Sequence, residues 1–173
     1  EELLKTFQKS VVVTNRDASF FVNWQKVIEH TAKLKIELSL MNSLIGSTDI
    51  ESDFRSLIKK YPETLRCVPI LIAMRPLKFP VIANFFASEQ SMNYLNFNKR
   101  RGSKLTINEV EEYLTFMKNS GLFIIFESIK NLYDYVLGVE VGMDTNARKN
   151  RSGQAMENLI SPVLRQISTE LGC

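Results

Sequence analysis

Apolar positions recur along most of the chain with the spacing of helices. Over 24–45 they follow a helical period as far as Gly46, which predicts one long helix. A second helix is expected over 50–60, because Ser47-Thr48-Asp49 offers an N-cap and Tyr61-Pro62 a stop. The first third of the chain is therefore expected to be helical.

The middle of the chain is less regular. An apolar stretch over 63–74 contains Pro69, so we expect a kink or a break in a short helix there. Residues 75–104 are interrupted by prolines and a glycine and indicate irregular structure. Within them the alternation of Met92, Tyr94, Leu95 and Phe97 favours a short strand or hairpin.

Helical signals return after residue 105. Thr106 and Glu109 have the spacing of a capping box, which predicts a helix up to Asn119. Two further apolar helices are expected over 122–127 and 131–141. A last helix is predicted over 153–168, with Ser152 as its cap and Pro162 as a possible bend. The chain is thus expected to be mainly α.

Composition excludes several classes of protein. The 173 residues, 45% of them hydrophobic, suffice for one domain or for one domain and part of a second. No apolar run reaches the roughly 18 residues of a membrane helix, so we expect a cytoplasmic protein with no membrane partner. There is no glycine-rich phosphate loop, which argues against a nucleotide cofactor. Cys67 and Cys173 form no disulfide framework.

A single histidine, His30, lies in the first predicted helix. Because no second histidine exists, the sequence excludes histidine-rich metal sites and Ser-His-Asp triads. We interpret His30 as a partnered or solvated surface residue.

The net charge of +3 is too small to indicate nucleic acid, so the distribution of the cations matters more. One cluster, Lys99, Arg100, Arg101 and Lys104, is interpreted as a solvated turn between elements. The other cluster lies within the segment GVEVGMDTNARKNRSGQAMENL, residues 138–159.

That segment is predicted to contain a polar loop directly before the last helix. Its donors, suited to phosphates and base edges, are Asn146, Arg148, Lys149, Asn150 and Arg151. Unpaired amides and the positive end of the helix dipole would add to them, which predicts an anion site at the helix start. A purely solvated loop is the alternative.

Glu157 follows on the flank of the apolar face of the last predicted helix. A carboxylate at that edge can ligate Mg²⁺, which prefers oxygen ligands. It is equally compatible with an ordinary surface glutamate.

The segment over 138–159 closely resembles the signature region of type II restriction endonucleases of the DpnII/MboI group, which cut at GATC. KLKIELSLMNSLIGS, YPETLRCVPILIA and NLYDYVLGVEVG also resemble N-terminal segments of that group, in the same order. The resemblance extends from about Trp24 to Glu157.

The resemblance implies Mg²⁺-dependent cleavage of both strands of double-stranded DNA at GATC by a homodimer. It implies Glu157 as a metal ligand and catalytic residue, and the five donors of the polar loop as DNA contacts. It implies a helical region over 1–137, followed over 138–173 by a basic signature loop and the first helix of a restriction-endonuclease-like α/β core.

One departure qualifies that picture. These enzymes also carry an Asp and a Glu-x-Lys or Glu-x-Asn after this helix, and no acid here has Lys two positions later. We therefore expect the sheet of the core to lie outside this chain and the chain alone to be inactive. Two alternatives stay open, a non-catalytic DNA-binding module and a helical dimerisation module.

Overall fold

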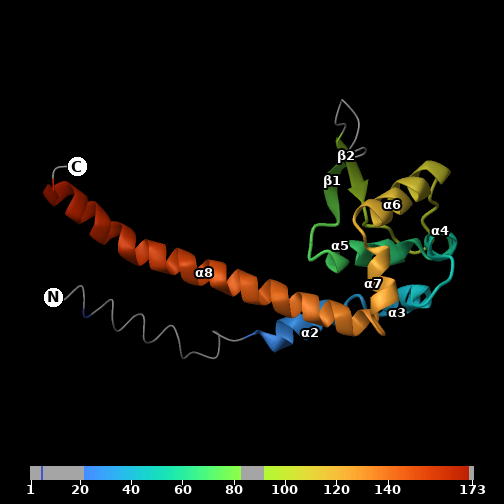
Figure 1. The fold of residues 1–173 in the computed structure, drawn as a ribbon, viewed down its shortest axis with the longest axis horizontal. Helices are drawn as coiled ribbons and strands as arrows, with labels where there is room; N and C mark the ends of the chain where they lie inside the picture. Colours follow the sequence, from blue (N-terminus) through green and yellow to red (C-terminus); the bar gives the residue numbers. More distant parts are fainter. Residues whose placement is uncertain (1–4, 6–21, 83–91, 172–173) are drawn as a thin grey trace. The chain divides into compact units, whose positions relative to one another are not determined.

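The computed structural model describes residues 5, 22–82 and 92–171 (Figure 1). The chain divides into two compact units, of which one is Ile28–Glu140. The described part of the other unit consists of residues 22–27 and 141–171. Each unit has its own internal contacts and is described by itself.

The described elements are mostly helical. In chain order they are α2 (Trp24–Ala32), α3 (Lys35–Met41), the 3₁₀ helix η2 (Asn42–Leu44), α4 (Ile50–Lys60), the 3₁₀ helix η3 (Pro62–Cys67), α5 (Val68–Leu71), β1 (Lys78–Ile82), β2 (Met92–Asn96), α6 (Ile107–Asn119), α7 (Phe123–Ser128) and α8 (Leu132–Leu171). The mainly α prediction is confirmed, while the restriction-endonuclease-like core stays a prediction.

The prediction of one continuous helix over 24–45 is wrong. The backbone N–H of Leu34 donates to the carbonyl oxygen of Thr31 at 3.1 Å, a tightened turn that separates α2 from α3. No glycine or proline stands at this point, so the sequence gives no local signal of the break. The expected stop at Gly46 is confirmed, since its φ of +73° suits glycine and it lies two residues after the end of η2.

The capping predictions for α4 and α6 are confirmed. The Asp49 carboxylate accepts a hydrogen bond from the backbone N–H of Ser52 at 3.2 Å and begins α4. At α6 the Thr106 hydroxyl accepts from the Glu109 N–H, and the Glu109 carboxylate accepts from the Thr106 N–H at 2.8 Å. Both signals depend on neighbours within one turn, which is why the sequence shows them.

The break expected near Pro69 is present. η3 ends at Cys67 and α5 begins at Val68, which places Pro69 in the first turn of α5, where its missing N–H costs no helical hydrogen bond. The segment is buried throughout Val68–Leu71.

The expected hairpin is also present. β1 and β2 pair antiparallel, with Lys78 opposite Asn96 and Pro80 opposite Tyr94. This two-stranded sheet is joined to α6 through aromatic side chains, because Phe79 lies 5.9 Å and Phe97 5.3 Å from the ring of Phe116. A two-stranded ribbon alone is marginally stable, so the aromatic contacts hold it in place.

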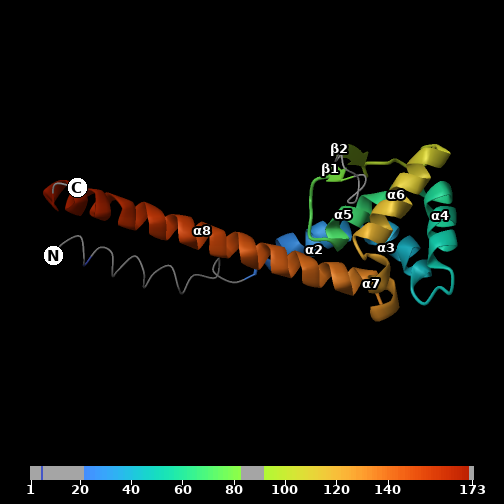
Figure 2. The same ribbon diagram turned by 45° about the horizontal axis from the view of Figure 1, so that its top comes forward.

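The core of the first unit lies between α3, α4, α6 and α7 (Figure 2). Its largest fully buried side chains include Phe54, Phe97, Phe126, Leu38 and Met117. The outer edges of α4 and α6 are joined by ion pairs, Arg55 to Glu111 at 2.9 Å and Lys118 to Glu51 at 2.8 Å. These pairs are half-exposed or exposed and contribute little, so apolar burial stabilises this unit.

Among the described residues, no helix is both long enough and apolar enough to cross a membrane. This holds for α8 as well, whose length comes with many charged and polar side chains.

Candidate nucleic-acid interface

The signature segment over 138–159 is helical throughout. α8 runs without interruption from Leu132 to Leu171, so the polar loop expected before Ser152 is wrong. The anion site expected at a helix start near Ser152 is wrong for the same reason, because residues inside a helix present no unpaired amides. Any role of this segment must therefore come from side chains on the surface of α8.

Two features explain why the composition of this segment wrongly predicts a loop. Gly138, Gly142 and Gly153 have nothing within 4 Å of an added Cβ, so none of them marks a close approach or a turn. Asp144, which belongs to this polar segment, accepts a hydrogen bond from the backbone N–H of Asn23 at 3.1 Å. The carboxylate is thus satisfied by another segment of the same unit and does not compete with the helix.

Four of the predicted site residues share one face of α8. Each residue turns an α-helix by roughly 100°, which brings Asn146, Lys149, Asn150 and Glu157 within a sector about 100° wide. All four side chains are exposed. We call this set the α8 polar face.

The length of the α8 polar face is set by helix rise. Asn146 and Glu157 are separated by about 16 Å along the axis, at roughly 1.5 Å per residue. Glu157 is therefore aligned with the amide and lysine side chains but lies about three turns away from Asn146. The face is a stripe along the helix and not a single cluster.

The two arginines of the segment do not join this face in the described structure. Arg148 is half-buried and leaves α8 on the side opposite to Asn146. Position 151 is helical, but the side chain of Arg151 lies outside the described residues. The expected roles of both arginines stay predictions.

Glu157 has polar neighbours and no second acid beside it. The Nε2 of Gln154 lies 3.4 Å from the Glu157 Oε2 and 3.3 Å from the Asn158 Oδ1. Among the described residues, no group of three or more His, Cys, Asp or Glu could hold a metal ion. Glu157 can thus give one oxygen ligand to Mg²⁺, and the described residues alone do not complete such a site.

Apolar side chains border the α8 polar face toward the C-terminus. Met156, Ile160 and Leu164 recur every fourth residue and are 39%, 36% and 59% exposed. This spacing gives a second, apolar stripe on the same helix.

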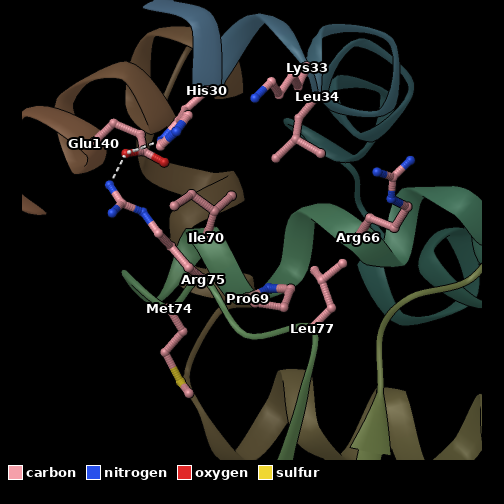
Figure 3. Close-up of a pocket in the computed structure, with 10 residues that line it drawn as sticks. All are labelled: His30, Lys33, Leu34, Arg66, Pro69, Ile70, Met74, Arg75, Leu77 and Glu140. Atoms are coloured by element: carbon pink, nitrogen blue, oxygen red, sulfur yellow. Dashed lines mark hydrogen bonds and ion pairs between the residues drawn. The ribbon is translucent and has the colours of Figure 1, made fainter. Parts of the chain in front are cut away.

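A separate pocket of about 240 Å³ lies within the unit Ile28–Glu140 (Figure 3). On one side of it, Arg75 Nη2 lies 2.6 Å and His30 Nδ1 3.5 Å from the buried Glu140 Oε2. The prediction that His30 is a partnered residue is confirmed. Because Arg75 neutralises the only carboxylate of the pocket, this group is best explained as a structural ion pair.

Glu140 was not predicted to be a buried acid. A usable signal exists, since Leu132, Val136, Glu140 and Asp144 recur every fourth residue and all four are buried. The helical period thus places both acids on the inner side of α8, away from the α8 polar face.

Cys67 is not a candidate nucleophile. Its side chain is fully buried, and burial raises the pKa of the thiol far above its ordinary value, with the Glu37 carboxylate adding to the effect. It is also a free cysteine, as expected.

Comparison with known proteins gives the class. The sequence model of the DpnII restriction endonuclease matches residues 3–171. The chain is 40% identical over 174 residues to the type II restriction enzyme DpnII of Streptococcus pneumoniae, covering 99% of this chain and 56% of that enzyme. It is 39% identical over 160 residues to the type II restriction enzyme MjaIII of Methanocaldococcus jannaschii, covering 91% of this chain and 53% of that enzyme.

A third relative is the type II restriction enzyme MboI of Moraxella bovis, 32% identical over 160 residues, covering 89% of this chain and 52% of that enzyme. All three relatives are type II restriction enzymes. The chain belongs to the DpnII restriction endonuclease family. It spans about half the length of the curated relatives that it matches. No solved structure matches it.

Proposed function

We propose that the full-length gene product is a type II restriction endonuclease that cleaves double-stranded DNA at GATC in the presence of Mg²⁺. The family membership over 3–171 carries this proposal. The α8 polar face supports it physically, because amide, ammonium and carboxylate groups on one exposed helix face suit contact with DNA.

In this proposal, Asn146, Lys149 and Asn150 contact DNA and Glu157 gives one ligand to the metal. The stripe of about 16 Å along α8 is close to the roughly 14 Å that four base pairs occupy along a duplex. Lys149 would neutralise a phosphate, and the two asparagines can donate and accept at base edges. The DNA contacts expected of Arg148 and Arg151 would lie outside this face, since Arg148 leaves α8 on the side opposite to Asn146.

Mg²⁺, when bound, supplies an activated water and charge stabilisation for phosphodiester hydrolysis. Glu157 would hold it through one carboxylate oxygen while Gln154, which also donates to the Asn158 Oδ1, orients that carboxylate. Further oxygen ligands would have to come from residues other than those described.

The test is cleavage of a plasmid by the full-length gene product. We expect cutting of a plasmid that contains GATC, no cutting when every GATC is mutated, and no cutting when the metal is chelated. Glu157→Gln should lower the cleavage rate at least about 100-fold, since the loss of a charged metal ligand removes several kcal/mol of stabilisation.

Glu127→Gln provides the matched control, because Glu127 is an exposed glutamate of α7 in the other unit. It should cleave like the wild type. A Glu157→Gln variant that cuts at the wild-type rate would remove Glu157 from the metal site, and a wild type that ignores GATC would contradict the proposed function.

We further infer that the protein acts as a homodimer whose contact includes the apolar stripe of Met156, Ile160 and Leu164. A palindromic site is matched by a two-fold symmetric protein, and exposed apolar residues at every fourth position suit helix pairing. Ile160→Asp with Leu164→Asp should halve the mass measured by light scattering. An unchanged mass would place the dimer contact elsewhere.

A further inference from the structure

The β1–β2 ribbon presents two different faces. Its inner face is apolar: Phe79, Leu95 and Phe97 are 8%, 5% and 0% exposed. Phe97 lies 5.3 Å from the rings of both Tyr113 and Phe116 on α6. The hydroxyl of Tyr113 also donates to the Asn96 carbonyl oxygen at 2.6 Å, so the ribbon is fixed to α6 at its inner face.

The outer face of the ribbon is exposed and carries polar and aromatic side chains. Lys78 pairs with Asn96 and Pro80 with Tyr94, and all four residues are exposed. Tyr94 is 65% exposed, with the Lys78 Nζ 5.8 Å from the centre of its ring. One exposed aromatic residue is ordinary in a soluble protein, so Tyr94 alone would carry no inference.

The turn that follows the ribbon presents two arginines. The Ser103 N–H donates to the Arg100 carbonyl oxygen at 3.0 Å, and the Arg100 N–H donates to the Ser103 hydroxyl at 3.2 Å. Gly102, with φ of +79°, occupies the position at which this turn needs glycine. Both Arg100 and Arg101 are exposed, as is Lys104.

The charged side chains of this region are all cationic. Residues 92–108 contain Lys99, Arg100, Arg101 and Lys104 and no Asp or Glu. The Lys99 Nζ forms an ion pair with the Glu109 Oε1 at 2.8 Å. Across the described ranges 22–82 and 92–171, no ion pair of Arg100, Arg101 or Lys104 with a carboxylate is present. Elsewhere in the first unit, four cations each form an ion pair with a carboxylate, namely Arg55, Arg66, Arg75 and Lys118, and they differ in this from the cations of the turn.

We propose that the outer face of the β1–β2 ribbon, together with the turn over 100–104, is a second DNA-contact surface, an inference that rests on the proposed function. Its occupant is double-stranded DNA, because a two-stranded ribbon fits the major groove. Tyr94 and Asn96 face the groove, and Arg100, Arg101 and Lys104 neutralise phosphates. Because the ribbon is attached to α6, this surface is held in one conformation, and DNA binding costs little conformational entropy.

The first test uses charge reversal in the full-length gene product. Arg100→Glu with Arg101→Glu should weaken binding of a labelled GATC duplex at least about tenfold at low salt and lower the salt slope of log K by about two. Lys59→Glu with Lys130→Glu changes the net charge equally at exposed positions outside the ribbon and should leave affinity and slope close to those of the wild type. Thermal melting confirms that each variant is folded.

The second test does not depend on a weakened variant. Tyr94→p-benzoylphenylalanine should give a photocrosslink to the GATC duplex, while the same replacement of Ile36, which is 74% exposed on α3, should give none. If the wild type binds and cuts GATC but position 94 does not crosslink and the arginine variant binds normally, the ribbon surface is excluded and the proposed function stands. If the wild type neither binds nor cuts GATC, both proposals fail.

Discussion

The two units of the molecule use charged side chains in opposite ways. In Ile28–Glu140 several acids of the helices form ion pairs: Glu37 with Arg66, Glu111 with Arg55 and Glu140 with Arg75, at distances between 2.6 and 3.2 Å. On the α8 polar face, Lys149 and Glu157 are exposed, and neither forms an ion pair with another described residue.

Substitutions in the two units should therefore have different effects. In the first unit the pairs lie around an apolar core, so a change there should alter folding. A change on the α8 polar face removes no internal contact of comparable energy, so it should alter binding and leave folding unchanged. Three substitutions and one labelling experiment test this contrast, in order of decreasing effect.

Phe54→Ala should destabilise the protein by about 3–5 kcal/mol, because a fully buried ring is lost and a cavity remains. The ring is 0% exposed and packs edge-on against Phe123 at 5.7 Å. Urea denaturation measures the change. Ile36→Ala, at a position 74% exposed, should shift stability by no more than about 0.5 kcal/mol. Equal effects of the two substitutions would contradict the assigned core.

Lys149→Glu should weaken binding of the GATC duplex about tenfold at low salt, since one phosphate contact is replaced by repulsion. The melting temperature should not change, because the side chain is exposed. Fluorescence anisotropy over a range of salt concentrations measures the affinity. Lys35→Glu, at an exposed position of α3, is the control. A Lys149→Glu variant that loses stability but binds the duplex as tightly as the wild type would contradict this expectation.

Glu109→Gln should destabilise the protein by about 1 kcal/mol, because the variant loses the ion pair with Lys99 and the charge-assisted hydrogen bond from the Thr106 N–H at the start of α6. The pKa of Glu109 is held below its ordinary value, chiefly by the hydrogen bond from Lys99 and then by that from the Thr106 N–H. Because the folded pKa is the lower one, this stabilisation is present above the unfolded pKa and is lost as the pH falls through the folded pKa.

Urea denaturation at pH 7 and at pH 3 measures the effect of Glu109→Gln. The difference between wild type and variant should shrink at the lower pH. Glu112→Gln, at an exposed position of the same helix, should leave stability nearly unchanged at both. A pH-independent difference would mean that the carboxylate charge is not what stabilises the cap.

Cys67 should resist alkylation in the folded protein, because burial raises the pKa of its thiol and blocks access. We expect little iodoacetamide label on Cys67 at pH 8 and full label after unfolding in urea, as determined by peptide mapping. Rapid labelling without denaturant would show that this part of the core opens readily.

Local signals allowed much of the first unit to be predicted from the sequence. The Asp49 cap, the Thr106 and Glu109 capping box and the stop at Gly46 depend on residues within one or two turns. The strand β1 was not predicted, because Pro80 interrupts it. In a two-stranded sheet each strand is an edge strand, where proline is tolerated.

The second unit was less predictable, for a different reason. Gly142, Gly153 and a polar run suggest a loop, but each glycine costs a helix only about 1 kcal/mol relative to alanine. The Asp144 bond to Asn23, 121 residues away in sequence, satisfies a side chain that would otherwise favour a turn. A contact at that distance along the chain cannot be found from local patterns. The candidate site residues were chosen from the sequence and stay predictions, and the arrangement of four of them on one helix face follows only from the continuity of α8.

The most direct test of the contrast is hydrogen–deuterium exchange of the full-length gene product, with a saturating GATC duplex and without it. Peptides that cover residues 145–158 of α8 should exchange more slowly in the complex, while peptides of α4 and α7 should exchange at the same rate in both states. Unchanged exchange over 145–158 in a protein saturated with the duplex would contradict the assignment of the α8 polar face to DNA.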